Sequence, residues 1–451
     1  MSSAHVLLSS LQDRSKLSAE SCRAMLAELL SFCRYEELKS EVVTHGVDTL
    51  LALAHDETHG HDDVVVEALL ELFAALMLDN YTTREWLVQK GVQHVALDAL
   101  DGFLGKKPTK RRNKIIKLAL EMTDQWSCVD ESQRPEPQDV VIVRVLRTLE
   151  NTADDTNILL HATAVLGCVL ERDAGNIRIV AQRDGIPILL RLLEMPEENM
   201  DIKRSVCEAL LIMGDASGMI QLMASYNTIH ALCVCLQAQV PGRDVESIAV
   251  QLLARLSEEA QVYGQIINED MLPLLFQVVD RNCNQLEIAA PTCIILERLS
   301  RFARDCKLDL SSYAQAAPCR GKVLINTAMC NVHVVNLVLS VFRFFVNISY
   351  NPVDLPLLIN SETIEGLLAL YILNGSSGSL STLSTDLVQV VSSLSRSTIE
   401  SVTLKDDDKS LPSIFLCLRN HYDNLRFTSQ VFALLTRYWR NQIRSNKPRI
   451  V

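Results

Sequence analysis

The chain has 451 residues, of which 48% are hydrophobic and 5% aromatic. Because a single compact core stops growing at roughly 250–300 residues, this length predicts several domains or a repetitive array. The apolar content excludes a disordered chain, and the net charge of −12 disfavours general nucleic-acid binding. Residues 1–100 hold 16 acidic and 7 basic side chains, so their net charge of −9 leaves only −3 for the other 351 residues.

The thirteen cysteines are scattered along the chain without a CxxC pair. This pattern predicts free thiols in a reducing, intracellular compartment. The first residues lack the basic region and apolar core of a signal peptide. Residues 323–342 carry no formal charge, but six polar side chains there disfavour a membrane span. We therefore expect a cytoplasmic protein, with a nuclear or ciliary location as alternatives.

Residues 1–38 are predicted to form an N-terminal helical cap. Ser18 can cap the N-terminus of a helix that carries Leu26 and Leu29, and Glu20 lies in the first turn of that helix. A terminal repeat needs a polar outer face, which this acidic segment can supply.

Residues 39–445 repeat one pattern, and residues 446–451 form a short basic tail. Each unit has an apolar position near the end of an amphipathic helix, and successive positions are 43 to 49 residues apart. A period in the forties with purely helical signals predicts a stack of helical repeats that bury their faces against one another. The nine positions are Leu76, Met122, Val169, Met213, Leu256, Leu299, Ile348, Leu394 and Tyr438.

The clearest unit spans residues 175–217. A short helix over 177–182 leads to a tight turn at Gly185, and Pro187 fits the first turn of a second helix. A third helix carries apolar residues on one face from Ile202 to Met213. Turns are also predicted at Gly46, Gly91 and Gly321, whereas the copies at 227–236 and 270–279 lack the glycine.

This unit resembles the armadillo repeat, whose GI-P-LL-LL … AL core is matched between Gly185 and Met213. The resemblance covers roughly residues 40–445, with a HEAT-like admixture left open. It implies an all-α, right-handed α-solenoid of about nine repeats that acts as a non-enzymatic scaffold or adaptor for a protein partner and needs no cofactor. A co-chaperone for Hsp70 or myosin and a cytoskeletal or ciliary assembly component are the alternatives.

Enzyme signatures such as GxxxxGK[ST], GxSxG and HExxH are absent from the sequence. The segment from His55 to Asp63 (HDETHGHDD) offers histidines and carboxylates that could bind a divalent metal ion. It falls between two helices of the first repeat, where a solvated polar loop is expected. We therefore predict no catalysis and no resident metal ion.

A basic run stands in an otherwise acidic region. Such a run can be a nuclear-import signal or an anion-binding patch, and the alternative is a helix start whose charges balance nearby acids. The run, taken as a secondary binding patch, comprises Lys106, Lys107, Lys110, Arg111, Arg112 and Lys114.

The resemblance implies that the third helix of each repeat lines a concave groove. Positions one and five residues before each apolar landmark lie on one face of that helix. They include three glutamates in the first four units, but four arginines and no glutamate in the last five. This change predicts a basic C-terminal groove that binds an acidic or extended peptide through Gln251, Arg255, Arg298, Arg343, Asn347, Gln389 and Arg437.

Asn347 lies where armadillo proteins place an asparagine that holds the peptide backbone. The tryptophan that accompanies this asparagine in import receptors is replaced by Arg343, which argues against an import receptor. Alternatively, the arginines pair with acids of adjacent repeats, such as Glu297 or Glu258.

Overall fold

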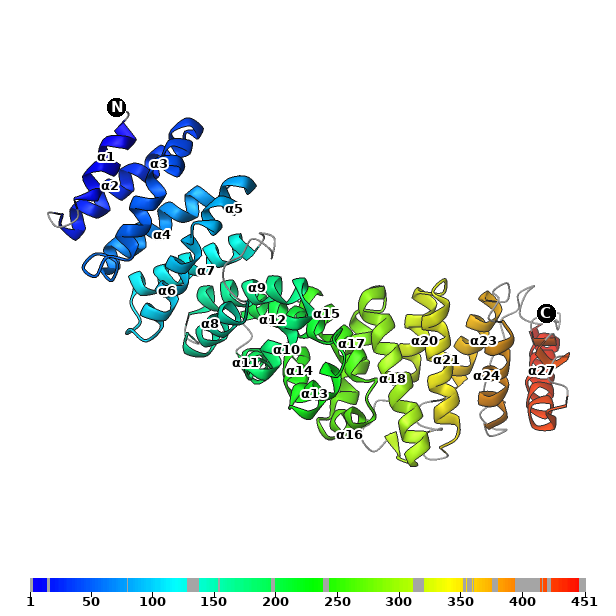
Figure 1. Ribbon diagram of the computed structural model, residues 1–451. Coiled ribbons are helices and arrows are strands. Elements are labelled where there is room, and N and C mark those ends of the chain that lie inside the picture. The colour runs from blue at the N-terminus through cyan, green and yellow to red at the C-terminus, as the bar shows by residue number, and fades with distance from the viewer. Residues whose placement is uncertain are drawn as a thin grey trace. The chain divides into compact units, whose positions relative to one another are not determined.

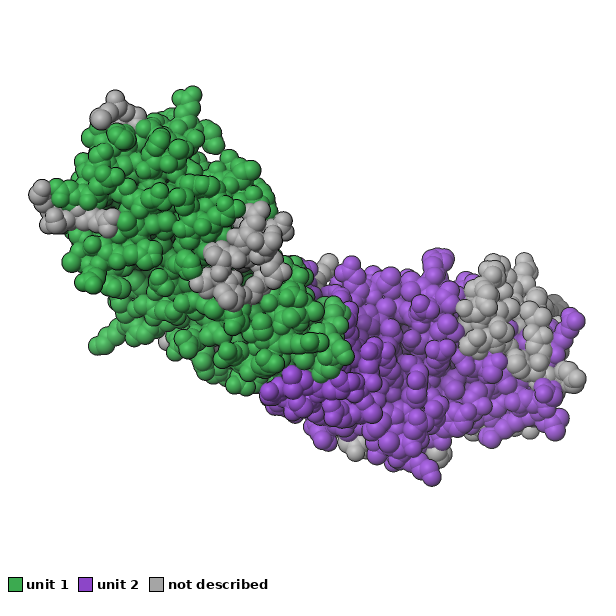
Figure 2. Space-filling model, viewed as in Figure 1, with its two compact units in different colours: residues 1–219 green, residues 220–451 purple. Residues whose placement is uncertain are grey.

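The computed structural model describes most of the chain, and every regular element in that part is a helix (Figure 1). Its contacts divide the chain into two compact units, residues 1–219 and 220–451 (Figure 2). The residues described are 3–13, 17–78, 80–127, 138–152, 155–195, 199–237, 243–310, 320–351, 354, 359, 361–374, 380–393, 414–415, 417–419 and 423–445.

Unit 1 is a stack in which equivalent helices of successive repeats pack side by side. The third helices α2, α4, α7, α9 and α12 pack in that order, and the second helices α3, α6, α8 and α11 form a parallel row (Figure 1). The helices are α1 (Ser3–Gln12), α2 (Ala19–Phe32), α3 (Glu36–Ala54), α4 (Asp63–Met77), α5 (Tyr81–Gln89), α6 (Val92–Leu104), α7 (Lys110–Ser127), α8 (Gln138–Asn151), α9 (Thr156–Arg172), α10 (Ala174–Gln182), α11 (Gly185–Leu193) and α12 (Met200–Met213).

Unit 2 repeats this arrangement. Its third helices α15, α18, α21, α24 and α27 pack in sequence, beside a row of the second helices α14, α17, α20 and α23. The helices are α13 (Met219–Ser225), α14 (Thr228–Gln237), α15 (Arg243–Leu256), α16 (Ala260–Asn268), α17 (Met271–Arg281), α18 (Leu286–Cys306), α20 (Arg320–Cys330), α21 (Val335–Ser349), α23 (Ser361–Leu373), α24 (Leu380–Ser393) and α27 (Leu425–Ser445).

The apolar landmarks of the sequence lie where the period predicts. The seven from Leu76 to Ile348 fall in the C-terminal half of a third helix, and each is at most 4% exposed. Leu394 lies outside the described residues, and the side chain of Tyr438 is outside them too. The landmark face is therefore the seam along which the described repeats bury their third helices.

The predicted turn at Gly46 is wrong, because α3 runs unbroken through this residue. An added Cβ at Gly46 would lie 2.8 Å from Cδ2 of Leu8 on α1. The glycine therefore permits a close approach of two helices instead of a change of chain direction.

The predicted turns at Gly91 and Gly185 are confirmed in two forms. Gly91 has φ of +89° just before α6, whereas Asp184 and Asp270 take the left-handed conformation before α11 and α17. Gly185 is instead needed for space, since a Cβ there would lie 2.4 Å from Cγ1 of Val180. Gly321 is the second residue of α20, and the residues before that helix lie outside the described part of the chain, so a turn at this position stays a prediction.

The N-terminal segment begins as its sequence predicts. Ser18 caps α2 by accepting a hydrogen bond from the Ser21 amide at 3.2 Å. Helix α1 packs against α3, and α2 packs against α4, as helices of later repeats do. The boundaries of the cap stay a prediction, and the basic tail 446–451 lies outside the described residues.

Within the described ranges no single helix has the length and apolar composition of a membrane span. Helices α13 and α14 reach them only as a pair bent by 78°.

Candidate partner-binding surface

The predicted surface runs over the third helices of unit 2. Its positions on α15, α18 and α24 are half-buried or exposed, as binding positions should be. Asn347 on α21 departs from this, because only 5% of it is exposed. For Arg437, on α27, the side chain is outside the described part of the chain.

Arg298 holds two repeats together. One of its Nη1 hydrogen bonds goes to the Ala254 carbonyl at 2.6 Å, and another to Oγ of Ser257 at 2.9 Å. Both acceptors lie at the C-terminus of α15, where a cation is favoured by the helix dipole. Nη2 also lies 3.4 Å from Glu258, which is one of the pairings that the alternative interpretation names. We therefore assign Arg298 to the support of the surface.

Asn347 is engaged in the same way. Its Nδ2 donates to Oγ of Ser300 on α18 at 3.1 Å, and its Oδ1 accepts from Nη1 of Arg304 at 2.7 Å. A peptide would have to displace these buried bonds, which cost more to break than exposed ones. In this structure Asn347 joins α21 to α18, so its role as a peptide clamp finds no support from its geometry.

Arg343 and Arg255 are exposed on α21 and α15. Burial raises the pKa of Asp386 on the neighbouring helix α24, and the charge of Arg343 partly opposes this shift. Oδ2 of this half-buried carboxyl group makes no hydrogen bond to the described residues. Arg343 is therefore exposed, with an acid of raised pKa near it on α24.

Two half-buried amides complete the row. Nε2 of Gln251 donates to Oγ of Ser247 at 3.1 Å, one turn earlier on α15. Gln389 lies on α24, near the C-terminal end of that helix. Both side chains can donate to and accept from a peptide backbone.

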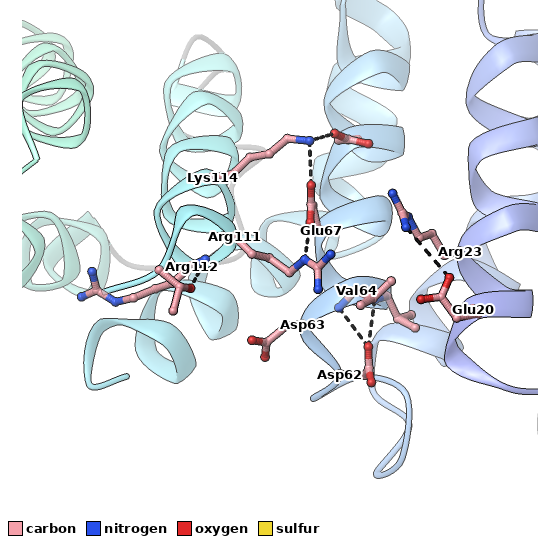
Figure 3. A network of polar contacts seen from close by, with 12 residues as sticks. Glu20, Arg23, Asp62, Asp63, Val64, Glu67, Arg111, Arg112 and Lys114 are labelled. Carbon is pink, nitrogen blue, oxygen red and sulfur yellow. Dashed lines mark hydrogen bonds and ion pairs between the residues drawn. The ribbon is translucent and has the colours of Figure 1, made fainter. Parts of the chain in front are cut away.

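The basic run of unit 1 is largely neutralised by acids of the preceding repeat (Figure 3). On α7, Arg111 and Lys114 reach Glu67 on α4 at 2.9 and 2.7 Å, and Lys114 also reaches Glu71 at 2.5 Å. Although burial alone would raise the pKa of Glu67, the hydrogen bonds and charges of Lys114 and Arg111 lower it. The alternative of balanced charges therefore describes this run best.

Arg112 is buried, with 4% exposed. Its Nε donates to the Phe103 carbonyl and its Nη2 to the Leu104 carbonyl, both at 2.9 Å and both at the C-terminus of α6. Burial lowers the pKa of this guanidinium. Arg112 is thus a helix cap and cannot contact a partner.

Of the other basic side chains, Lys106 pairs with Asp63 at 2.8 Å and lies 3.7 Å from the centre of the Phe103 ring. Lys107 and Lys110 are exposed and form no ion pair with a described residue. The predicted patch of six is therefore reduced to these two lysines. Its use as a nuclear-import signal stays a prediction.

The segment from His55 to Asp63 is an exposed or half-buried polar loop, as its composition predicts, except at His59. His59 is buried, and its ring nitrogens lie 2.9 Å from Oδ2 of Asp56 and 3.0 Å from the Leu17 carbonyl. Because both partners are acceptors, the doubly protonated ring suits them, and these bonds raise the pKa of His59. Asp62 accepts bonds from two amides at the start of α4. No group of three potential ligands gathers in the described residues.

Unit 1 also has a cavity of about 450 Å³ that the sequence did not reveal. It is lined by buried apolar residues of α4 and α6, among them Val66, Leu69 and Val95, and by the exposed Asp98 and Lys106. Its mixed lining does not indicate a particular ligand.

Solved structures with a similar fold were found, although no protein-family model and no curated protein matches the sequence. A structure described by the phosphorylation switch that controls the interaction between cadherin and beta-catenin has a TM-score of 0.63. It is 11% identical, and the match covers 96% of this chain and 82% of that one. The chain has an armadillo-like fold.

Two further structures agree with this fold. The SYS-1/POP-1 complex has a TM-score of 0.53 at 11% identity, with 96% of this chain and 91% of that chain covered. An engineered protein has a TM-score of 0.55 at 13% identity, and the match covers 97% of this chain and 99% of that protein. The all-α solenoid expected from the sequence is confirmed.

Proposed function

We propose that this chain is a non-enzymatic scaffold that binds an acidic, extended segment of a protein partner on the third helices of unit 2. The feature that carries the proposal is the exposed pair Arg255 and Arg343, with the amides of Gln251 and Gln389 in the same row. The matched beta-catenin and SYS-1 structures are described by their partners, cadherin and POP-1, which supports a binding role for this fold.

The spacing of the two arginines sets the length of the ligand. Adjacent packed helices lie about 8–10 Å apart, so α15 and α21 are roughly 16–20 Å apart with α18 between them. An extended chain covers about 3.3 Å per residue, so two carboxylates about five or six residues apart would meet both arginines.

Fluorescence anisotropy with synthetic peptides tests this proposal. The peptides carry two Glu-Glu pairs placed either six or two residues apart, and the protein variants are the wild type and Arg255→Glu/Arg343→Glu. We expect the wide spacing to bind better, and the double reversal to weaken binding about tenfold or more, because each exposed pair contributes about 0.2–1 kcal/mol and reversal adds repulsion.

Lys107→Glu/Lys110→Glu is the matched control, since it changes the charge equally and alters exposed lysines of unit 1. Equal weakening by both double variants would show that net charge alone governs binding. Unchanged binding in Arg255→Glu/Arg343→Glu would reject the surface.

A further inference from the structure

Two cysteines of unit 2 lie next to each other outside the third-helix surface. Cys283 follows α17, and Cys330 is the last residue of α20. Helices α17 and α20 are second helices of adjacent repeats and pack against each other. The repeat period therefore brings together thiols that are 47 positions apart.

The backbone near the two cysteines is joined by hydrogen bonds of Asn331, the residue that follows Cys330. Nδ2 of Asn331 donates to the Cys283 carbonyl at 2.6 Å and to the Thr327 carbonyl at 2.9 Å. These bonds attach the C-terminal end of α20 to the backbone of Cys283. An interaction with the Cys283 thiol contributes, after burial, to the raised pKa of Cys330.

An oxidant can reach this pair. Cys330 is exposed and Cys283 is half-buried. By contrast, Cys293 on α18 is buried, and burial raises its pKa to about 12, so it is protonated and shielded. Cys306, at the C-terminus of α18, is exposed and provides a reference thiol.

We propose that Cys283 and Cys330 form an oxidation-sensitive dithiol site that closes into a disulfide between two repeats. Hydrogen peroxide oxidises the Cys330 sulfur to a sulfenic acid and releases one water. The Cys283 sulfur then attacks the sulfenic sulfur, the S–S bond forms, and the S–O bond breaks to release a second water. The two thiols lose two electrons and two protons, and peroxide accepts them.

The protonation of Cys330 sets the rate of the first step. Its pKa is raised, chiefly by burial and then by Cys283. Because the thiolate is the nucleophile, oxidation by peroxide accelerates as the pH rises above neutrality. A thiol reductant reverses the reaction by exchange.

The bond would stabilise unit 2. It closes a loop of about 47 residues and restricts the unfolded chain. The oxidised protein is expected to melt on the order of 5 °C higher than the reduced protein.

Peptide mapping of the full chain tests the proposal. The protein is treated with hydrogen peroxide, alkylated and digested with trypsin, which yields peptides 282–298 and 323–343. We expect a cross-linked pair of these peptides that disappears after treatment with dithiothreitol. Fragmentation must place the link at Cys283, because Cys293 shares the peptide 282–298.

Three variants complete the test. Cys283→Ser and Cys330→Ser should abolish both the link and the rise in Tm, whereas Cys306→Ser should retain both. A link at Cys293, or oxidation of Cys330 to sulfinic acid without a link to Cys283, would overturn the proposal.

Discussion

The third helices of the two units are built alike, yet their charged side chains have different roles. Unit 1 holds 35 acidic and 23 basic residues, and its basic run is paired with α4 or buried except at Lys107 and Lys110. Unit 2 holds 20 of each, and it leaves Arg255 and Arg343 exposed. The comparison shows that the neighbour one repeat away, more than the number of charges, decides how exposed a cation is.

Arg112 in unit 1 and Arg298 in unit 2 each cap the C-terminus of a helix, and we expect their loss to lower the free energy of unfolding most. Arg112→Ala removes a buried guanidinium from two carbonyls of α6 and should cost about 2–4 kcal/mol in the free energy of unfolding. Arg298→Ala removes a more exposed cap in unit 2 and should cost about 1 kcal/mol.

Urea unfolding followed by circular dichroism measures both losses, with Lys107→Ala as an exposed control that should change stability by less than about 0.5 kcal/mol. If Arg112→Ala were as mild as Lys107→Ala, the guanidinium would not be needed to satisfy those carbonyls.

The pairing across α4 and α7 is tested next. Glu67→Gln removes the shared partner of Arg111 and Lys114 and should destabilise the protein by about 1 kcal/mol at neutral pH. Since the pKa of Glu67 is lowered in the folded protein, its contribution is complete above the unfolded pKa and is lost as the pH falls through the folded pKa.

The difference between wild type and Glu67→Gln should therefore shrink below about pH 4, where urea titrations can follow it. It should also shrink in 1 M NaCl, because exposed pairs are screened. A loss that persists unchanged at pH 2.5 would point to packing as its cause.

The loop before α4 should make stability depend on pH less strongly than Glu67 does, and in the opposite direction. The raised pKa of His59 means that its stabilising contribution is complete below about pH 6.5 and is lost as the pH rises through the folded pKa. His59→Ala should remove this part of the pH dependence, by less than about 1 kcal/mol.

NMR titration of the His59 ring checks the shift directly. A midpoint at or below that of an unperturbed histidine would contradict the assignment of two acceptor partners.

The smallest effect concerns the acid beside Arg343. Asp386→Asn removes a half-buried carboxyl group with a raised pKa, so it should raise Tm slightly at pH 7 and have no effect below about pH 4. It should also strengthen peptide binding by less than about threefold, because Arg343 loses a competing acid. Thermal melts across this pH range and anisotropy measure the two effects, and a lower Tm at pH 7 would be the contrary result.

The sequence predicted the repeats well because burial is periodic. The landmarks from Leu76 to Ile348 are buried along one seam, since each helix can cover its apolar face only with its neighbours. The turn at Gly46 was predicted wrongly because a glycine in a turn and a glycine under a neighbouring helix leave the same sequence signal.

The site was harder to predict, because the position of a side chain on its own helix does not show whether it binds a residue of a neighbouring repeat. Arg298 and Asn347 occupy the positions expected to face the groove, but they reach partners 44 and 47 residues away. The pairs Arg111–Glu67 and Lys106–Asp63 are 44 and 43 residues apart. A search for partners one repeat period away from each charged residue would have revealed these pairs from the sequence.

Hydrogen–deuterium exchange of the full chain would show whether the third helices of unit 2 bind the peptide. The protein would be compared with and without the peptide that carries two Glu-Glu pairs six residues apart. We predict slower exchange in α15, α18 and α21 of unit 2, and no change in α4 and α7 of unit 1. Slower exchange confined to α4 and α7, or none anywhere at saturating peptide, would contradict the account.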